Sequence, residues 1–181
     1  MGTTRLVSRR RQDSGAKWAR IAMAVLATAG LIDTGSITLK RWGLLGNLTC
    51  PMGADGCDKV LNSAWGTVFA GIPLSLVGVL AYGAVLLMAL LPLLPGLQEN
   101  KSDMSRRTWW GLFAVSLGMA VFSGVLLGVM LLKIQAFCFF CVLSAALSLA
   151  LFVLSIVGGG WDDFGQLLFR GVLLALAVLL G

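Results

Sequence analysis

Five long apolar runs dominate this sequence and restrict the folds that are open to it. They occupy about residues 18–39, 70–95, 108–132, 137–158 and 161–181. A helix needs roughly 20 predominantly apolar residues to cross the hydrocarbon core of a bilayer. Apolar residues make up 58% of the chain and charged residues only 12%, whereas about a quarter of a typical soluble domain is charged. We therefore predict an all-α integral membrane protein.

The runs also predict how the 181 residues are divided. Residues 1–17 form a basic tail, residues 18–160 hold a four-helix transmembrane bundle, and residues 161–181 form a fifth transmembrane helix. The fifth span is the weakest of the five because it contains Arg170. Its length from Trp161 gives a helix of about 31 Å, which is just enough to cross.

Two features inside the spans have structural and functional interpretations. Gly124 and Gly128 form a G-x-x-x-G pattern, with Gly111 earlier in the same run. Small residues at these intervals let helices approach closely, so we predict helix packing there. Asp33 lies in the first run, and an ionisable residue within a span suggests a functional site. Because hydroxyl residues follow Asp33, we expect instead that it reaches the membrane interface or a neighbouring helix.

The net charge of +6 is better explained by membrane topology than by nucleic-acid binding. Cytoplasmic loops of membrane proteins are enriched in Lys and Arg. An N-terminus in the cytoplasm leaves ten basic residues on the inner side and four on the outer side. The inner ones are Arg5, Arg9, Arg10, Arg11, Lys17, Arg20, Lys101, Arg106, Arg107 and Arg170, and the outer ones are Lys40, Arg41, Lys59 and Lys133. We predict this orientation, with every cysteine at the outer face.

Cys138 and Cys141 form a Cys-x-x-Cys at the start of the fourth run. Residues three apart on a helix share one face, so a dithiol or a disulfide is possible there. Free N–H groups and the helix dipole favour a thiolate at a helix N-terminus, which makes such a pair reactive. Two alternatives are small apolar residues packed in a bundle and a four-cysteine zinc site. No histidine is present and no polar shell for a metal is evident, so we predict no metal site.

Cys50 and Cys57 lie in the loop over residues 40–69, in the stretch CPMGADGC. Its glycines and proline allow the chain to turn back and close a disulfide. This pair is either a structural staple or one half of a relay in which disulfide exchange passes electrons to the second pair. Residues 58–65 predict a short amphipathic helix that lies across the outer end of the bundle as a cap.

Together these residues resemble the vitamin K epoxide reductase family. The pattern consists of the C-x6-C loop, then Ser63, Trp65 and Gly66, and the later Cys-x-x-Cys, and the resemblance covers roughly residues 20–160. The fifth run is similar to that of bacterial members, in which a thioredoxin-like domain often follows. The resemblance therefore implies a bacterial inner membrane. No such domain lies within these residues, so we expect either a shortened chain or a separate redox partner.

The resemblance implies a bundle around a quinone of the ubiquinone, menaquinone or phylloquinone type. A reduced thioredoxin-like protein of the periplasm or lumen would attack Cys50, the released Cys57 would attack Cys138, and Cys141 would reduce the quinone. Ser63 would hold a quinone oxygen or the loop helix. The apolar pocket would be lined by aromatic residues, which also serve as ordinary interface anchors: Trp65, Phe69, Phe137, Phe139 and Phe140.

One departure from the family pattern bears on the substrate. Vertebrate members that reduce vitamin K epoxide have a tyrosine four residues after the Cys-x-x-Cys, where this chain has Ala145. We therefore expect quinone reduction coupled to disulfide formation rather than epoxide reduction. A thiol transporter with the reverse electron flow would need a cysteine on the inner side, where none is expected. The remaining alternative is a non-catalytic membrane scaffold or subunit stapled by disulfides.

Overall fold

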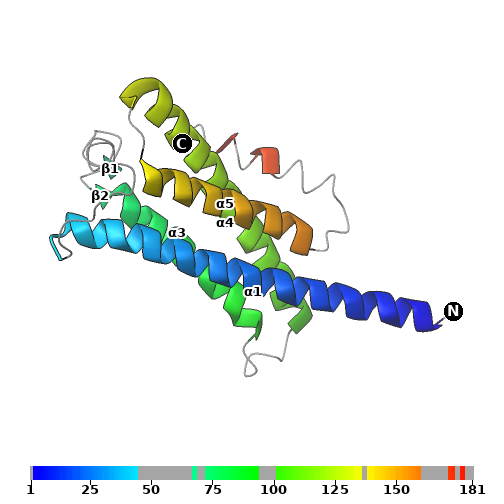
Figure 1. Ribbon diagram of the computed structural model, residues 1–181. Helices are drawn as coiled ribbons and strands as arrows, with labels where there is room; N and C mark the ends of the chain where they lie inside the picture. Colours follow the sequence, from blue (N-terminus) through cyan, green and yellow to red (C-terminus); the bar gives the residue numbers. More distant parts are fainter. Residues whose placement is uncertain are drawn as a thin grey trace.

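The part of the chain that a computed structural model describes is almost entirely helical (Figure 1). It describes residues 2–44, 67–68, 72–93, 101–135, 138–159, 171–173 and 176–177. The long helices are α1 (Gly2–Arg41), α3 (Leu74–Leu90), α4 (Lys101–Val129) and α5 (Phe139–Gly158). Stretches long and apolar enough to cross a membrane cover residues 16–40, 74–93, 105–133 and 139–158. The predicted all-α fold with a four-helix transmembrane bundle is confirmed.

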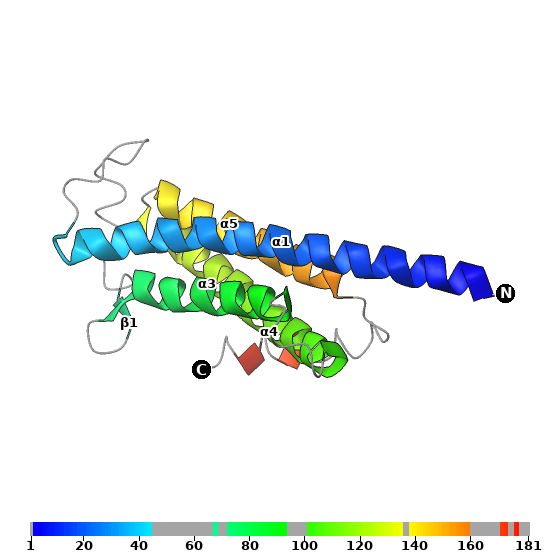
Figure 2. The same ribbon diagram turned by 90° about the horizontal axis from the view of Figure 1, so that it is seen from below.

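The four helices form a bundle in which each one packs mainly against two others. Helix α1 packs between α3 and α5, and α4 contacts both α3 and α5 (Figure 2). The end of α1 and the starts of α3 and α5 lie at one end of the bundle (Figures 1 and 2). We call this the dithiol end, because α5 begins directly after Cys138.

Helix α1 is much longer than a bilayer requires. Its 40 residues rise about 60 Å along the helix axis, twice the thickness of the hydrocarbon core. Figure 1 shows its N-terminal part extending beyond the other helices. The backbone of the segment predicted as a separate basic tail, residues 1–17, is therefore helical from Gly2 and continuous with the first span.

A small hairpin precedes α3 where the sequence predicts only a helix from about residue 70. Strand β1 (Thr67–Val68) pairs antiparallel with β2 (Ile72–Pro73). Pro73 is the N-cap of α3, with φ −64° and ψ 134°. Proline has no N–H for a helical hydrogen bond, and its fixed φ suits the residues that open a helix. Helix α3 consequently begins at Leu74.

A second proline explains a buried arginine at the opposite end. Helix α3 passes at residue 91 into a 3-10 turn, η3 (Leu91–Leu93), which contains Pro92. Pro92 has no N–H to donate to the carbonyl of Met88, four residues earlier. Arg20 of α1 donates to that carbonyl at 3.3 Å and also to Ser105 and Thr108 at the start of α4, at 3.1–3.2 Å. One side chain therefore ties three helices together.

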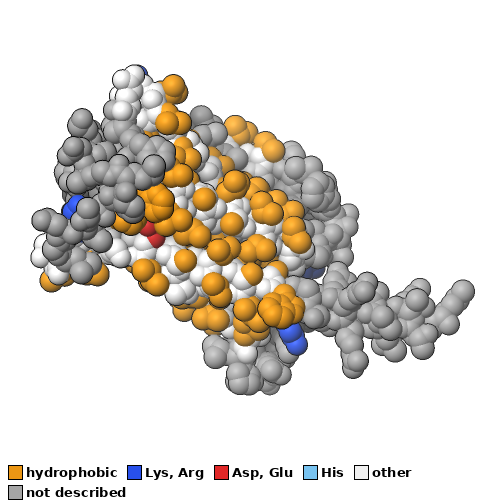
Figure 3. All heavy atoms as spheres, viewed as in Figure 1, with side chains coloured by type: hydrophobic (Ala, Val, Ile, Leu, Met, Phe, Trp, Pro, Cys, Tyr) orange, Lys and Arg blue, Asp and Glu red, His pale blue; other side chains and the backbone are white. Residues whose placement is uncertain are grey.

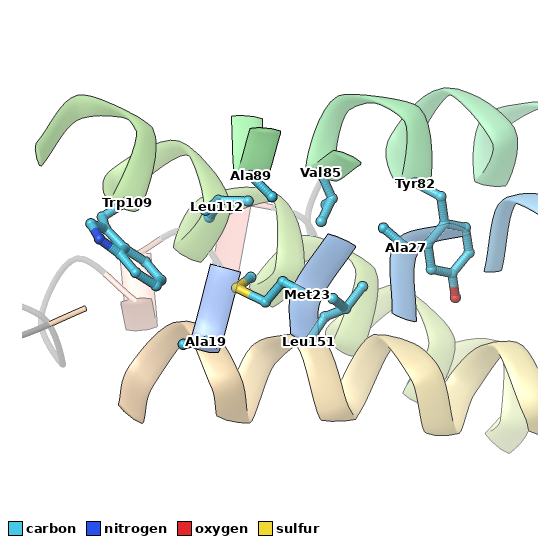
Figure 4. Packing of buried hydrophobic residues seen from close by; sticks show 9 residues of the cluster. All are labelled: Ala19, Met23, Ala27, Tyr82, Val85, Ala89, Trp109, Leu112 and Leu151. Carbon is cyan, nitrogen blue, oxygen red and sulfur yellow. The ribbon is translucent and has the colours of Figure 1, made fainter. Parts of the chain in front are cut away.

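Small residues let the helices approach closely around the core in Figure 4. A Cβ on Gly30 of α1 would overlap the ring of Tyr82, and one on Gly111 of α4 would lie 2.8 Å from the sulfur of Met88. Gly124 and Gly128 differ from the prediction, because an added Cβ at either position would meet no described atom within 4 Å. The buried core residues are Ala19, Met23, Ala27, Tyr82, Val85, Ala89, Trp109, Leu112 and Leu151.

The outer faces of the helices are apolar, as a lipid environment requires. Figure 3 shows hydrophobic side chains spread across the flank of the bundle, while basic side chains appear only near its two ends. Of the predicted fifth span, only residues 171–173 and 176–177 are described, and these are helical. Gly171 lies beside Phe113 of α4, so this segment contacts the bundle. The predicted cap helix over 58–65 lies outside the described residues.

Candidate redox site

A tight reversal of the chain positions the two cysteines. Helix α4 ends in a π-helical turn, η5 (Met130–Ile134), and Gln135 then adopts the left-handed conformation with φ 50° and ψ 35°. A residue in this conformation commonly ends a helix. Cys138 follows as the N-cap of α5 in an extended conformation, and its carbonyl accepts the hydrogen bond from Val142 N–H at 3.1 Å.

The two sulfurs meet on one face at the start of α5, as the spacing predicts. The Sγ atoms are 2.9 Å apart, and Cys141 is the donor in this S–H···S hydrogen bond. Both residues are free thiols. The two sulfurs are therefore close enough for a disulfide bond to form between them. Cys138 is completely buried, against Met130 and Phe140, whereas Cys141 is half-buried.

The surroundings of Cys138 favour its ionised form. The hydrogen bond from Cys141 lowers the pKa of the Cys138 thiol to about 7, and the N–H groups of Cys141 and Phe140 act in the same direction. Burial and the negative charge of Asp33 oppose this shift in the pKa. The structure therefore assigns the thiolate of the dithiol form to Cys138. The family resemblance implies a thiolate on Cys141 in a different state, the one in which Cys138 is bonded to another sulfur.

Asp33 of α1 is the only acidic residue whose side chain is described. It is buried, with 6% of its surface exposed, and neither carboxylate oxygen has a hydrogen-bond partner among the described residues. Its charge interacts with Cys138, with Cys141 and with the hydroxyl of Tyr82. Of the two expected positions, the membrane interface does not fit the burial of Asp33, whereas a position against neighbouring helices does.

Tyr82 links α3 to α5 one helical turn further into the bundle than Cys141. Its hydroxyl donates to the carbonyl of Ser144 at 2.9 Å and lies 3.0 Å from the Ser144 hydroxyl. Ser144 is one helical turn from Cys141. Sequence reasoning missed Tyr82 and Ser144. The available signal was that Tyr82 is the only tyrosine in the chain and stands in the middle of an otherwise apolar span.

The other predicted site residues are described only in part. Phe140 packs against the buried cluster around Cys138, and its ring meets that of Phe139 edge-on, with centroids 6.1 Å apart. Ala145, on the same helix, is buried. The remaining predicted residues lie outside the described residues: Cys50, Cys57, Ser63, Trp65, Phe69 and Phe137. Among the described residues no cluster of acidic, histidine or cysteine side chains could hold a metal ion.

Four packed helices of membrane-spanning length, with a dithiol at the head of one of them, define a helical membrane protein built around thiol chemistry. The chain belongs to the vitamin K epoxide reductase family, whose sequence profile matches residues 21–156. It is also 32% identical over 150 residues to "Thiol-disulfide oxidoreductase LTO1" of Arabidopsis thaliana. That alignment covers 82% of this chain and 39% of the relative, so the chain spans well under half the length of LTO1.

Proposed function

We propose that this protein is a membrane thiol oxidoreductase that oxidises a thioredoxin-like partner and reduces a quinone, thereby supporting disulfide bond formation. The observation that carries the proposal is the free Cys138–Cys141 dithiol, 2.9 Å between sulfurs, at the N-terminus of a spanning helix. Family membership and the name of the LTO1 relative support the same chemistry.

The proposed cycle uses both cysteine pairs. A thiolate of the partner attacks Cys50 in the Cys50–Cys57 disulfide, which forms a mixed disulfide, and Cys57 leaves as a thiolate. The second thiol of the partner then attacks the mixed disulfide, so that the partner departs with its own disulfide and Cys50 is freed as a thiolate. Cys57 attacks Cys138 in the Cys138–Cys141 disulfide, so that Cys141 is released as a thiolate. Resolution by Cys50 returns the loop disulfide and leaves the second pair as a dithiol. Each exchange breaks one S–S bond and forms another, so no electrons are lost.

The second half of the cycle reoxidises the dithiol. Two S–H bonds break, one S–S bond forms between Cys138 and Cys141, and two electrons and two protons are released. A quinone supplies the chemistry to accept two electrons and two protons. The described residues suit an apolar acceptor, because Cys138 is packed among Leu127, Met130 and Phe140 while Cys141 stays half-buried at the bundle margin. We propose Ser63, Trp65, Phe69 and Phe137 as further contacts of the acceptor.

The distribution of basic residues supports an N-terminus in the cytoplasm and the dithiol at the outer face. Lys17, Arg106 and Arg107 are exposed at the end of the bundle opposite the dithiol. Positive residues concentrate on the cytoplasmic side of membrane proteins. An outer dithiol end meets an oxidising compartment, in which disulfides persist. We propose a bacterial inner membrane and a periplasmic thioredoxin-like partner.

The test is quinone reduction by purified protein supplied with a reduced thioredoxin-like protein, with a ubiquinone and a naphthoquinone compared. We expect Cys138→Ala and Cys141→Ala to reduce the rate to background. Leu143→Ala is the matched control, since it truncates an exposed side chain on the same turn of α5. Wild-type rates in both cysteine variants would sink the proposal.

A second experiment on the same purified protein distinguishes an enzyme from a scaffold that is stapled by disulfides. Thiol trapping after exposure to a dithiol donor should show the Cys138–Cys141 pair alternating between reduced and oxidised forms as quinone is added. Cysteine pairs that stay oxidised and inert toward both reagents would favour the scaffold.

A further inference from the structure

The buried carboxylate of Asp33 has no role in the cycle above, although burying an ionisable group in a membrane protein is costly. Each of its oxygens lacks a hydrogen-bond partner among the described residues. An unpaired buried carboxylate destabilises a fold unless it binds a proton. An ionisable residue within a membrane span is therefore a candidate for a functional role. Arg20, the buried basic residue on the same helix, is bonded at the other end of the bundle and is about three and a half helical turns away.

The contacts of Tyr82 fix the height of Asp33 relative to the sulfurs. Tyr82 packs its ring on Gly30 of α1 and bonds its hydroxyl to Ser144 of α5. Helices α1 and α5 run in opposite directions, because α1 ends and α5 begins at the dithiol end. On α1, Asp33 lies about one turn nearer the dithiol end than Gly30. On α5, Cys141 lies about one turn nearer that end than Ser144. The carboxylate and the dithiol are therefore at the same level in the bundle.

Neighbouring contacts confirm this register. Thr34 lies against Gly78 of α3, and Thr38 bonds Ser75 at 2.9 Å one turn nearer the dithiol end. The charge of Asp33 acts on both sulfurs, in agreement with this placement.

From this arrangement we propose that Asp33 is a positioning residue of the redox centre, whose carboxylate controls when the Cys138–Cys141 dithiol releases its protons. A negative charge beside a thiol disfavours a second negative charge on sulfur. When Asp33 is ionised it holds the protons on the pair, and when Asp33 binds a proton it permits the thiolate. The biological purpose of this control rests on the proposed function, because oxidation of the dithiol releases two protons together with two electrons.

Among the described side chains of the other helices, Asp33 is the charged group that acts on both sulfurs. Helix α5 contributes Cys138 and Cys141, and α3 contributes Tyr82. In its described part near the dithiol, α4 contributes no titratable residue. The basic residues of this end with described side chains are Lys40, near the end of α1, and the exposed Lys133 in η5.

The test is the pH dependence of thiolate formation, followed by ultraviolet absorbance of the thiolate. It uses the reduced full chain in detergent, with Cys50→Ser and Cys57→Ser so that only one pair titrates. Ultraviolet detection does not require reagent access, which matters because Cys138 is fully buried. We expect Asp33→Asn to lower the midpoint by roughly one pH unit, within the range for removal of a neighbouring like charge.

Three comparisons make this result specific. Asp33→Glu keeps the charge and should keep a midpoint near that of the wild type. Thr34→Val is the matched control, because it removes an adjacent buried hydroxyl without changing any charge. Asp33→Ser, a second neutral variant, guards against one substitution that fails to fold, as judged by gel filtration. Unchanged midpoints in the neutral variants that fold, or the same shift in Thr34→Val, would overturn the inference.

No quinone or partner protein enters this measurement. A failure of the proposed function would appear in the quinone assay and leave the titration intact. A failure of the Asp33 inference would leave quinone reduction by the wild type unaffected.

Discussion

Cys138 and Cys141 carry the same thiol but occupy different positions relative to the backbone of α5. Cys138 is the N-cap, where the first N–H groups of the helix have no helical acceptor, and Cys141 lies within the first turn. Cys141 donates its S–H to Cys138, which makes Cys138 the better site for negative charge. The order of the two residues along the helix therefore decides which sulfur ionises first.

Replacing Cys141, which donates the hydrogen bond, should return the pKa of the Cys138 thiol toward that of an ordinary cysteine. In Cys141→Ala the hydrogen bond that lowers the pKa of Cys138 to about 7 is lost, so the midpoint should rise toward the ordinary value of 9.0. The thiolate is present above the midpoint and lost below it, so its signal at pH 7 should fall by at least about tenfold. Ultraviolet titration of the reduced protein lacking Cys50 and Cys57 measures the change.

Cys141→Ser is the control for this prediction, because its hydroxyl can still donate to Cys138. Its midpoint should lie between those of the parent protein and Cys141→Ala. Equal midpoints in the parent and both variants would show that the hydrogen bond does not govern ionisation.

At the level of elements, the packing of α1 on α3 depends on where glycine lies on α1. Gly30 faces the completely buried ring of Tyr82, whereas an added Cβ at Gly35 would meet no described atom within 4 Å. Close approach at Gly30 lets the tyrosine hydroxyl reach α5, so one glycine supports two helix contacts near the dithiol.

This difference predicts opposite effects for two identical substitutions. Gly30→Ala should cost about 1–3 kcal/mol of unfolding free energy, because a methyl group is forced into a packed ring that cannot move freely. Gly35→Ala should be neutral or stabilise by up to about 1 kcal/mol through higher helix propensity. Denaturation of the purified protein by a graded unfolding detergent, followed by circular dichroism, compares them.

A double substitution identifies the cause. Gly30→Ala combined with Tyr82→Leu should lose less stability than the sum of the single variants, since the smaller side chain relieves the overlap. Strict additivity would assign the loss at Gly30 to something other than the tyrosine ring.

At the scale of the whole molecule, the sequence predicts the spans better than their packing. Apolar length alone identifies four spans, and an interval of three residues places Cys138 and Cys141 on one face. Spans that are apolar on every side carry little information about which face turns inward. The pattern therefore did not predict that Gly30 rather than Gly124 lies at a close contact.

The polar contacts escaped sequence analysis for a related reason. The charge pattern places Arg20 among the basic residues of the inner side, but the carbonyl of Met88 and the start of α4 give it partners within the bundle. Asp33 left two interpretations open because its neighbours in space come from α3 and α5 rather than from adjacent residues. Such partners become apparent only when the register between helices is known.

The orientation of the whole protein in the membrane can be tested with two variants that each carry one cysteine, at opposite ends of the bundle. In a variant lacking its four native cysteines, Gln135→Cys reports on the exposed turn at the dithiol end, and Thr3→Cys reports on the start of α1. A membrane-impermeant maleimide applied to intact cells should label position 135 and leave position 3 unlabelled, because the excess of basic residues keeps the N-terminus inside. After permeabilisation both positions should react, which controls for accessibility. The reverse pattern would place the dithiol in the reducing cytosol, where a disulfide-forming role has no oxidising compartment to serve.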